Sequence, residues 1–372
     1  MLETMNGNGV KAMKRREFLK TTALVAVAAA LPGRILAANG RDGIRAVLLH
    51  VGHNLWCDWY PEGTDLMNVP KESLPDVKLR CVDALWKQAA DHAVAKGLNM
   101  IVIDIAEGLV YPSHPELAIE GSWSAEKMSA EVRRLKALGI EVIPKLNFST
   151  THDGWLKQYR RLVSTPQYYA VCADVLKDAY EIFGRPRFIH IGCDEEDHVY
   201  HIMQSKTRQF VLTRRGEVWK NDFLFYVRTV EKLGARAWCW SDYGWDHPDF
   251  HVWCPKTVVM SDWYYDEGHG GFDPATNPVE EDRKRIAQYA ALEAAGFDQI
   301  PCGTNWSGWK RDQEKCGADD VIGKLVSYCR RAIAPERLMG FMMASWAATD
   351  TEKNLSFAKR GIDLLADAVK ES

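Results

Sequence analysis

The sequence predicts an α/β protein with a single (β/α)₈ barrel, also called a TIM barrel. Two patterns predict it: short apolar runs alternate with stretches of helical period, and a glycine follows most of these stretches. Repeated helix–Gly–strand units indicate parallel strands that are joined by crossover helices. Eight expected strands, with a helix after nearly every one, favour a closed barrel over an open doubly wound sheet.

The expected strands are the short apolar runs. They are Ala46–His50, Met100–Ile105, Glu141–Leu146, Arg187–Ile191, Ala235–Trp240, Thr257–Ser261, Gln299–Gly303 and Met339–Ala344. The expected helices have a hydrophobic period near 3.6 residues. They are Leu79–Lys96, Ala125–Leu138, Pro166–Phe183, Phe223–Leu233, Glu280–Ala295, Asp319–Ala334 and Phe357–Val369. The glycines that follow helix ends, where a cap favours positive φ, are Gly97, Gly139, Gly184, Gly234 and Gly296.

The composition excludes several classes of protein. The 372 residues include 47 Lys and Arg and 50 Asp and Glu, so the net charge of −3 gives no basic footprint for nucleic acid. The chain has no GxGxxG and no GxxxxGK[ST] loop, and we therefore expect no nucleotide and no other cofactor. Nine cysteines without a CxxC pair indicate neither a zinc ribbon nor a disulfide framework. Fourteen tryptophans suit a core, or a site that stacks flat ligands such as sugar rings.

Residues 1–38 predict a signal peptide. Lys14–Lys20 contains Arg15-Arg16 and resembles the twin-arginine export motif, and the apolar stretch Ala23–Leu31 follows it. Cleavage is expected near Ala37 or Ala38. The alternative is an amphipathic helix that stays in the cytoplasm. No later segment reaches the roughly 18 apolar residues of a membrane span. We expect a periplasmic or extracellular protein whose residues 39–372 form the single barrel.

The active site of such a barrel lies at the carboxyl ends of its strands. The residues that follow the expected strands and suit the binding of a polar ligand are His53, Asp104, His152, Trp240, Asp242, Trp263, Tyr264, Trp306, Trp346 and Asp350. Any single tryptophan is more often a core residue. As a set beyond parallel strands, these tryptophans predict a stacking platform.

The strongest local signal is Phe188–Glu195, an apolar strand that ends in Asp194 and Glu195. Adjacent carboxylates there are costly unless they are used, hydrogen-bonded or solvated. This stretch resembles the His-x-Gly-Gly-Asp-Glu motif of family 20 glycoside hydrolases, the β-N-acetylhexosaminidases. Tyr111–Leu117 and Leu138–Pro144 also resemble segments of that family. His152 stands in the place of its Pro-Gly-His histidine, and Trp346 resembles its terminal pocket tryptophan.

The resemblance implies a glycosidase that acts on terminal 2-acetamido sugars with retention of configuration. It implies that Glu195 is the general acid and that Asp194 orients the substrate's acetamido group. The carbonyl of that group would attack the anomeric carbon, so no enzyme carboxylate becomes covalently attached. A neighbouring carboxylate that stays charged raises the pKa of the acid beside it. The implied partner is a carbohydrate substrate.

The sequence departs from the family pattern at positions of sugar recognition. Cys193 replaces the second motif glycine, and Lys145 and Asn147 replace the acidic residues of the family's Pro-Glu-x-Asp segment. No arginine follows the first strand, where Gly52-His53-Asn54 stand instead, and Ala348 replaces a glutamate after the last tryptophan. These departures bear on which sugar is bound more than on the Asp194–Glu195 pair.

Three other interpretations stay open. Asp194-Glu195-Glu196-Asp197 could be a solvated acidic loop, because runs of acidic residues usually lie at the surface. The chain could be a metal-dependent TIM-barrel hydrolase whose ligands come from His190, Asp194, Glu195, His198 and His201, although it has no HExxH motif. It could also be a carbohydrate-binding barrel that has kept the aromatic platform and lost the chemistry. We expect no metal.

Overall fold

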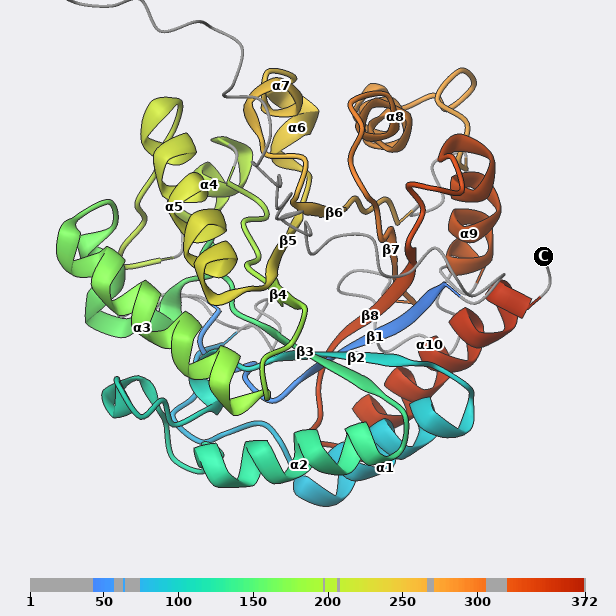
Figure 1. The fold of residues 1–372 in the computed structure, drawn as a ribbon. Coiled ribbons are helices and arrows are strands. Elements are labelled where there is room, and N and C mark those ends of the chain that lie inside the picture. Colours follow the sequence, from blue (N-terminus) through green and yellow to red (C-terminus); the bar gives the residue numbers. More distant parts are fainter. Residues whose placement is uncertain are drawn as a thin grey trace, which may run out of the picture. The chain divides into compact units, whose positions relative to one another are not determined.

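The described residues form eight parallel strands, which lie at the centre of the fold (Figure 1). The strands are β1 (Ile44–His50), β2 (Met100–Asp104), β3 (Glu141–Lys145), β4 (Phe188–His190), β5 (Arg236–Trp240), β6 (Val259–Ser261), β7 (Cys302–Gly303) and β8 (Gly340–Ala348). They pair in the order β6-β5-β4-β3-β2-β1-β8-β7. Parallel bridges between Met260 and Gln299 and between Trp263 and Cys302 link the two edges. The predicted (β/α)₈ barrel is confirmed.

The computed structural model describes residues 43–56, 63, 74–196, 198–205, 208–265, 271–305 and 320–370, and only the backbone of 198–200 and 203. The predicted signal peptide lies outside the described residues. Among the helices of the described part, none is long and apolar enough to cross a membrane.

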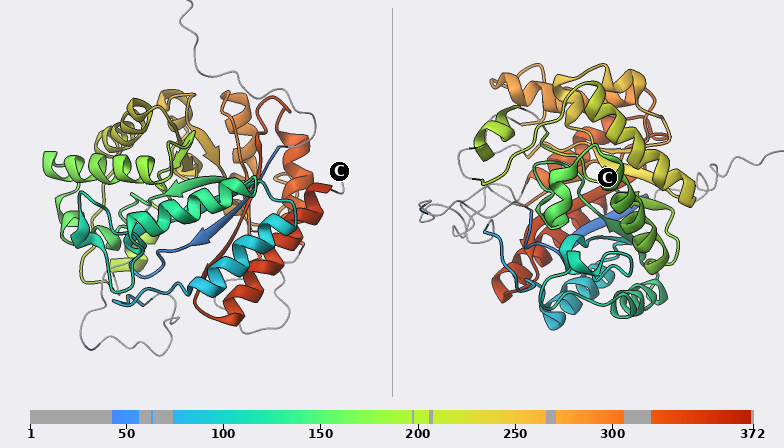
Figure 2. Two further views of the ribbon diagram at one scale, coloured as in Figure 1. Left: turned by 60° about the horizontal axis from the view of Figure 1, so that its bottom comes forward. Right: turned by 90° about the vertical axis from the view of Figure 1, so that its left-hand side faces the viewer.

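Helices surround the strands on their outer side (Figures 1 and 2). They are α1 (Asp83–Ala95), α2 (Ala125–Ala137), α3 (Pro166–Ile182), α4 (His198–Ser205), α5 (Glu217–Leu233), α6 (Tyr243–Asp246), α7 (Phe250–Trp253), α8 (Glu280–Ala294), α9 (Val321–Ala332) and α10 (Glu352–Lys370). Short 3₁₀ turns, η2 (Ala106–Gly108), η3 (Pro115–Leu117) and η4 (Gly154–Leu162), lie in the loops after β2 and β3. The last helix, α10, lies beside α1, so the two ends of the barrel domain meet.

Local sequence explains where these helices begin and end. The Ser124 hydroxyl accepts a hydrogen bond from the Lys127 backbone N–H and caps α2, and Thr165 caps α3 in the same way ahead of Pro166. Gly234 ends α5 with φ of +96°, a left-handed conformation that glycine adopts without strain. Each predicted helix is observed, and the largest differences are at three starts: α5 and α10 begin six and five residues earlier than expected, and α1 begins four residues later. Helices α4, α6 and α7 were not predicted.

Alternation along each strand separates two apolar layers. One side chain of each neighbouring pair points outward and packs under the helices, as Val47, Ile101 and Cys239 do. Its neighbour points inward and fills the barrel, as Leu48 and Trp238 do. Because this period is two residues, the last inward-facing residue of each strand is fixed by sequence position. Those last residues form the floor of the candidate site.

Candidate active site

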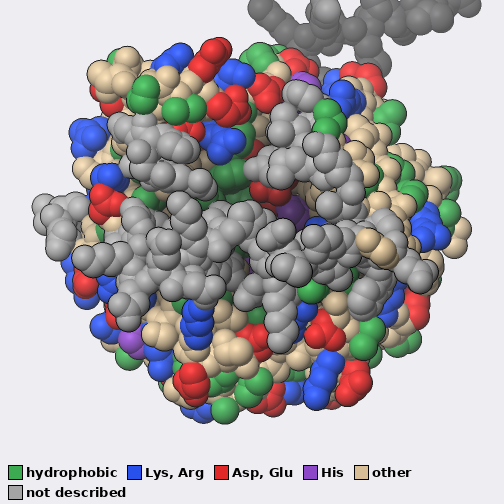
Figure 3. All heavy atoms as spheres, turned by 180° about the vertical axis from the view of Figure 1, so that it is seen from behind, with side chains coloured by type: hydrophobic (Ala, Val, Ile, Leu, Met, Phe, Trp, Pro, Cys, Tyr) green, Lys and Arg blue, Asp and Glu red, His purple; other side chains and the backbone are tan. Residues whose placement is uncertain are grey.

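The carboxyl end of β4 continues into residues 191–196, which carry the predicted catalytic pair. Both carboxylates face the imidazole of His152, which follows β3. Glu195 Oε2 lies 2.9 Å and Asp194 Oδ2 lies 3.4 Å from His152 Nε2. The side chains of Asp194 and Glu195 are 13% and 24% exposed, so a ligand can reach them. On the face shown in Figure 3, acidic and histidine side chains are likewise visible together in a recess near the middle.

Two adjacent carboxylates can reach one imidazole only if the backbone between them is not extended. Neighbouring side chains of an extended strand point to opposite faces. Here φ is +71° at Gly192, +71° at Cys193 and +59° at Glu195. A Cβ on Gly192 would lie 2.1 Å from Asn147 Oδ1, so this position requires glycine. Cys193 adopts the left-handed conformation despite its side chain, at a cost of about 1–2 kcal/mol.

Asn147, at the carboxyl end of β3, fixes this bent segment. Its Nδ2 donates to Asp194 Oδ1 at 2.8 Å, and its Oδ1 accepts from the Cys193 backbone N–H at 3.2 Å. The hydroxyl of Ser149 donates to the Asp194 carbonyl at 2.5 Å. One asparagine therefore orients the Asp194 carboxylate and holds the backbone that carries it. An aspartate at this position, as in the family motif, could not donate to Asp194 unless protonated.

Asp242 follows β5 and brings a third carboxyl group to the pair. Its Oδ2 accepts a hydrogen bond from the Glu195 backbone N–H at 2.7 Å. Burial, together with the nearby charges of Asp194 and Glu195, raises the pKa of Asp242 well above its usual value. Asp242, which was predicted to bind substrate, therefore contacts the backbone of Glu195, the predicted acid.

His152 balances the charge of these carboxyl groups. Burial alone would lower the pKa of its imidazole, but the negative charges of Asp194 and Glu195 raise it to about 9. The imidazole therefore carries a second proton at neutral pH. One proton is then available at the contact between His152 Nε2 and Glu195 Oε2.

The floor of the site consists of the last inward-facing residues of the strands. Lys145 Nζ lies 2.5 Å from Asp104 Oδ2, and both side chains are almost fully buried. His50 Nδ1 lies 3.9 Å from the same carboxylate oxygen. Burial raises the pKa of Asp104, and the Lys145 charge opposes that rise. Burial and the same Lys145 charge hold the pKa of His190 well below its ordinary value, so His190 is neutral.

Aromatic rings line one side of this floor. The ring of Trp240 lies 4.8 Å from that of His190 and 5.6 Å from that of Trp346. Trp346 Nε1 donates to the Tyr265 hydroxyl at 3.1 Å, and the ring of Tyr265 lies 5.1 Å from that of Trp263. Three of the four predicted platform tryptophans are thus linked, through one tyrosine that was not predicted. The fourth, Trp306, lies outside the described residues.

The other predicted residues are placed less directly. His53 is buried against the rings of His50 and Trp56. The Tyr264 hydroxyl contacts Asp282 and Asn277 in the outer apolar layer, so the structure does not bring it to the catalytic pair. Its neighbours Trp263 and Tyr265 point inward, as alternation requires. Asp350 accepts a hydrogen bond from Asn354, four residues later in the chain.

Lys145, His50 and Tyr265 are not among the predicted site residues. All three could have been predicted from the alternation of side chains along a strand. Each lies an even number of residues from an inward-facing position and therefore points to the same side. The hypothesis of a solvated acidic loop is wrong for Glu196, which is buried and paired with Arg214 at 2.6 Å. Asp197 lies outside the described residues.

Metal-ligand atoms of three residues come together in the described part of the chain. His152, Asp194 and Glu195 each offer one such atom, and these atoms lie within 4.8 Å of one another. His201, named in the metal-hydrolase interpretation, instead contacts the Thr150 hydroxyl. His190 lies on the barrel floor, where its Nδ1 accepts from the Gly192 backbone N–H. Within the described part of the chain, His190 and His201 therefore do not join Asp194 and Glu195 in one ligand set. The side chain of His198 lies outside the described part.

Comparison with known proteins relates the fold to solved structures. No protein-family model and no curated protein sequence matches the chain. A β-N-acetylhexosaminidase from Bacteroides fragilis NCTC 9343 is 16% identical with a TM-score of 0.53, covering 86% of this chain and 65% of its own. The family 20 β-N-acetylhexosaminidase from Streptomyces coelicolor A3(2) is 14% identical with a TM-score of 0.54. The match covers 86% of this chain and 63% of that protein. Dispersin B is 16% identical with a TM-score of 0.52, covering 78% and 95%.

The chain spans less than two thirds of the first two of these proteins. At this level of identity the similarity concerns the path of the backbone, not the chemistry of the side chains. The described part of the chain has the (β/α)₈ barrel fold that is also found in solved structures of β-N-acetylhexosaminidases.

Proposed function

We propose that this chain is a divergent family 20 glycoside hydrolase that releases terminal 2-acetamido sugars by substrate-assisted, retaining catalysis. The observation that carries the proposal is the convergence of Asp194 and Glu195 on one nitrogen of His152, at the carboxyl end of the barrel strands. That is the place where barrels of this kind carry out their chemistry. The names of solved structures with this fold agree with the substrate class.

The spacing of the carboxylates supports a substrate-assisted reaction. An ordinary retaining glycosidase holds its two carboxyl groups about 5–5.5 Å apart, one on each side of the bond that is cleaved. Here one carboxylate oxygen of Asp194 and one of Glu195 lie 3.4 Å and 2.9 Å from the same imidazole nitrogen. A sugar ring does not fit between two groups that share one partner. Asp194 is therefore poorly placed to attack the anomeric carbon, and the substrate's own acetamido oxygen takes that role.

In the proposed first step, the Glu195 carboxyl group protonates the glycosidic oxygen while the acetamido carbonyl oxygen attacks the anomeric carbon. The bond to the leaving alcohol breaks, and a cyclic oxazolinium ion forms on the sugar. Asp194 accepts a hydrogen bond from the acetamido N–H and stabilises the positive charge of this ion. In the second step, Glu195 removes a proton from water, which attacks the anomeric carbon and reopens the ring.

His152 supports Glu195 in both steps. With a pKa of about 9, its imidazole holds a proton at neutral pH next to Glu195 Oε2. That positive charge stabilises the Glu195 carboxylate that remains after the glycosidic oxygen has been protonated. Asn147 keeps Asp194 turned toward the site.

The aromatic side of the site supports carbohydrate as the ligand. Trp240, Trp346, Tyr265 and Trp263 offer flat faces, and Trp346 and Tyr265 also offer polar edges. Sugars stack their C–H faces on such rings while their hydroxyl groups form hydrogen bonds. We further propose export by the twin-arginine route to the periplasm or the extracellular space, on the basis of Arg15-Arg16 and the apolar stretch behind them.

The proposal is tested with the mature protein and an aryl β-glycoside of a 2-acetamido sugar. We expect release of the aryl group, loss of turnover in Glu195→Gln, and no effect of a chelator. Arg134→Gln, which removes an ion pair on the outer helix α2, is the matched control and should retain full activity. Binding of the sugar without turnover would support the non-catalytic barrel instead. Loss of activity with the chelator, restored by a divalent cation, would support the metal-dependent hydrolase.

A further inference from the structure

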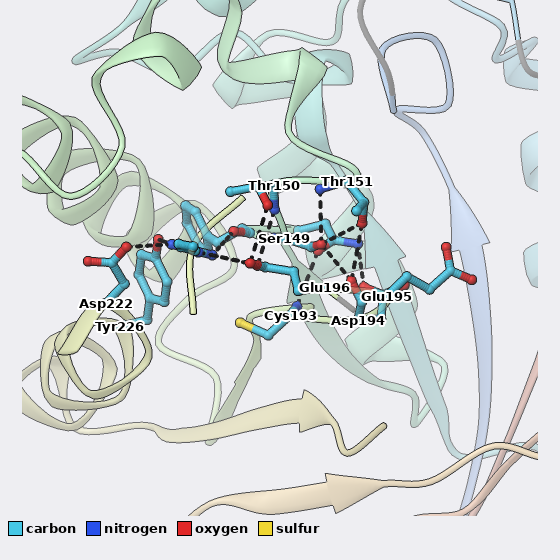
Figure 4. A network of polar contacts seen from close by, with 12 residues as sticks. Ser149, Thr150, Thr151, Cys193, Asp194, Glu195, Glu196, Asp222 and Tyr226 are labelled. Carbon is cyan, nitrogen blue, oxygen red and sulfur yellow. Dashed lines mark hydrogen bonds and ion pairs between the residues drawn. The ribbon is translucent and has the colours of Figure 1, made fainter. Parts of the chain in front are cut away.

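Glu196, the residue directly after the proposed acid, is buried and held by several hydrogen bonds. Its carboxylate accepts two hydrogen bonds from Arg214, from Nε at 2.9 Å and from Nη2 at 2.6 Å (Figure 4). It also accepts from the backbone N–H of Thr150 at 3.1 Å and from the Thr150 hydroxyl at 3.2 Å. Neither charged group of this pair is accessible to a ligand, since the side chains of Glu196 and Arg214 are 0% and 2% exposed.

Arg214 connects this carboxylate to two other parts of the barrel. Its Nη2 donates to the Phe148 carbonyl at 2.6 Å, in the segment that follows β3. Its Nη1 donates to Asp222 at 2.8 Å and to the Tyr226 hydroxyl at 3.0 Å, both on α5. The guanidinium group therefore ties the segment after β4 to the segment after β3, which carries His152, and to the helix that precedes β5.

A buried ion pair of this kind is weak support for stability alone. The cost of removing two charges from water often equals what their attraction returns, and an apolar pair of similar volume can replace them without loss. Its position suggests another use. The two residues Cys193 and Glu195 have left-handed φ angles, and such conformations persist only where the surroundings hold them. Glu196 is the anchor immediately beyond this strained stretch.

We infer that the Glu196–Arg214 ion pair is a positioning device for Glu195. It fixes the chain on the far side of the bent backbone, and thereby keeps the Glu195 carboxylate in contact with His152. The inference rests on the proposed function for the role of Glu195, and goes beyond it by assigning a catalytic consequence to two residues that do not touch the substrate.

The test is the double variant Glu196→Leu/Arg214→Met, which removes both charges and keeps most of the volume. Asp222 keeps hydrogen bonds from Ser164 and Tyr169 in this variant, so it is not left without donors. We expect kcat to fall about 10²-fold, the effect of a displacement of about 1 Å in an active site. KM should stay within about threefold, because no substrate contact is removed.

A conservative variant and a remote control separate positioning from general disruption. Glu196→Gln keeps the length and one acceptor oxygen, so we expect it to retain more kcat than the double variant. Arg134→Gln, on α2, removes a partly exposed pair with Glu131 and should leave kcat unchanged. If the double variant does not fold, Arg214→Lys replaces it, because lysine keeps the charge but cannot form the paired contact with the carboxylate.

A second readout does not depend on catalysis. NMR follows the titration of the His152 imidazole, which faces Asp194 and Glu195 and also feels the more distant charge of Lys145. In the folded double variant, or in Arg214→Lys, we expect its midpoint to fall from about 9 toward the ordinary value near 6.5. The inference would be overturned by a folded variant whose His152 titrates at the wild-type midpoint. If the wild-type protein is an active enzyme, the variant would also have to keep the wild-type kcat. If wild type cleaves no glycoside, the proposed function fails, and the His152 titration still decides whether the pair positions Glu195.

Discussion

His152 Nε2 lies 2.9 Å from Glu195 Oε2, while the same nitrogen lies 3.4 Å from Asp194 Oδ2. One imidazole therefore serves two neighbouring carboxylates. This arrangement depends on the left-handed backbone at Cys193 and Glu195, without which the two side chains would point apart. It links the protonation of His152 both to the stability of the fold and to the proposed chemistry.

The first prediction concerns stability against pH. The folded-state pKa of His152, about 9, lies above the ordinary value near 6.5. The protonated His152 therefore stabilises the folded state fully below pH 6.5, and this stabilisation is lost as the pH rises through 9. At 1.36 kcal/mol per pKa unit, the contribution is about 3 kcal/mol. Denaturant unfolding at pH 6 and pH 9.5 should show this decline in wild type. His152→Asn should lack it; an equal decline in both proteins would contradict the assigned pKa.

The second prediction separates the roles of the two carboxylates. Glu195→Gln should be most damaging for substrates with poor leaving groups, because good leaving groups need little protonation. Asp194→Asn should slow formation of the oxazolinium ion whatever the leaving group. Steady-state kinetics with a series of aryl 2-acetamido glycosides measures, for each variant, how the rate depends on the leaving group. Azide should not restore the activity of either variant by reacting with a glycosyl ester on the enzyme, because no such ester forms. The same leaving-group dependence in both variants would refute the division of labour.

The third prediction concerns the aromatic side of the site. Trp346→Ala and Trp240→Ala should each weaken binding of the monosaccharide product by about 1–3 kcal/mol, the order expected for a buried aromatic contact. Trp86→Ala is the control, since Trp86 lies on α1 in the outer apolar layer, where its Nε1 donates a hydrogen bond to Glu131. It should lower stability and leave affinity unchanged. If all three variants lower stability alone, the inward tryptophans are core residues and not a platform.

The fourth prediction concerns export. Replacement of Arg15-Arg16 by two lysines should leave unprocessed precursor in the cytoplasm, because the twin-arginine motif is read as an address. Cell fractionation and the mass of the N-terminal peptide measure the outcome. Export and cleavage of the variant at the wild-type rate would contradict this route.

Most of the barrel could be predicted because its signals are local. Apolar runs such as Met100–Ile105 differ from β2 by one residue, and the five capping glycines all have positive φ. The inserted helices α4, α6 and α7 were missed because four to eight residues are too few for a helical period to be visible. Tyr264 was assigned to the site by its position after a strand, whereas alternation turns it outward.

The arrangement inside the site depends on contacts that a sequence pattern does not encode. Asp194, Glu195 and His152 could be named from motifs, but not their convergence on one nitrogen, which requires the bent backbone. Glu196 and Arg214 are 18 residues apart on either side of α4, with no periodic relation between them. Only the folded chain shows that Glu196 is a buried anchor and not part of a surface acidic loop.

The central claim is that the substrate supplies its own nucleophile. The most direct test is the ratio of kcat/KM for two aryl glycosides that differ only at position 2, one with an acetamido group and one with a hydroxyl group. We expect efficient cleavage of the acetamido compound and almost none of the hydroxyl compound. We also expect strong inhibition by a thiazoline mimic of the intermediate, since ligands that resemble the transition state bind tightest. Efficient cleavage of the hydroxyl compound, with a glycosyl ester trapped on Asp194, Asp242 or another carboxylate, would contradict the claim.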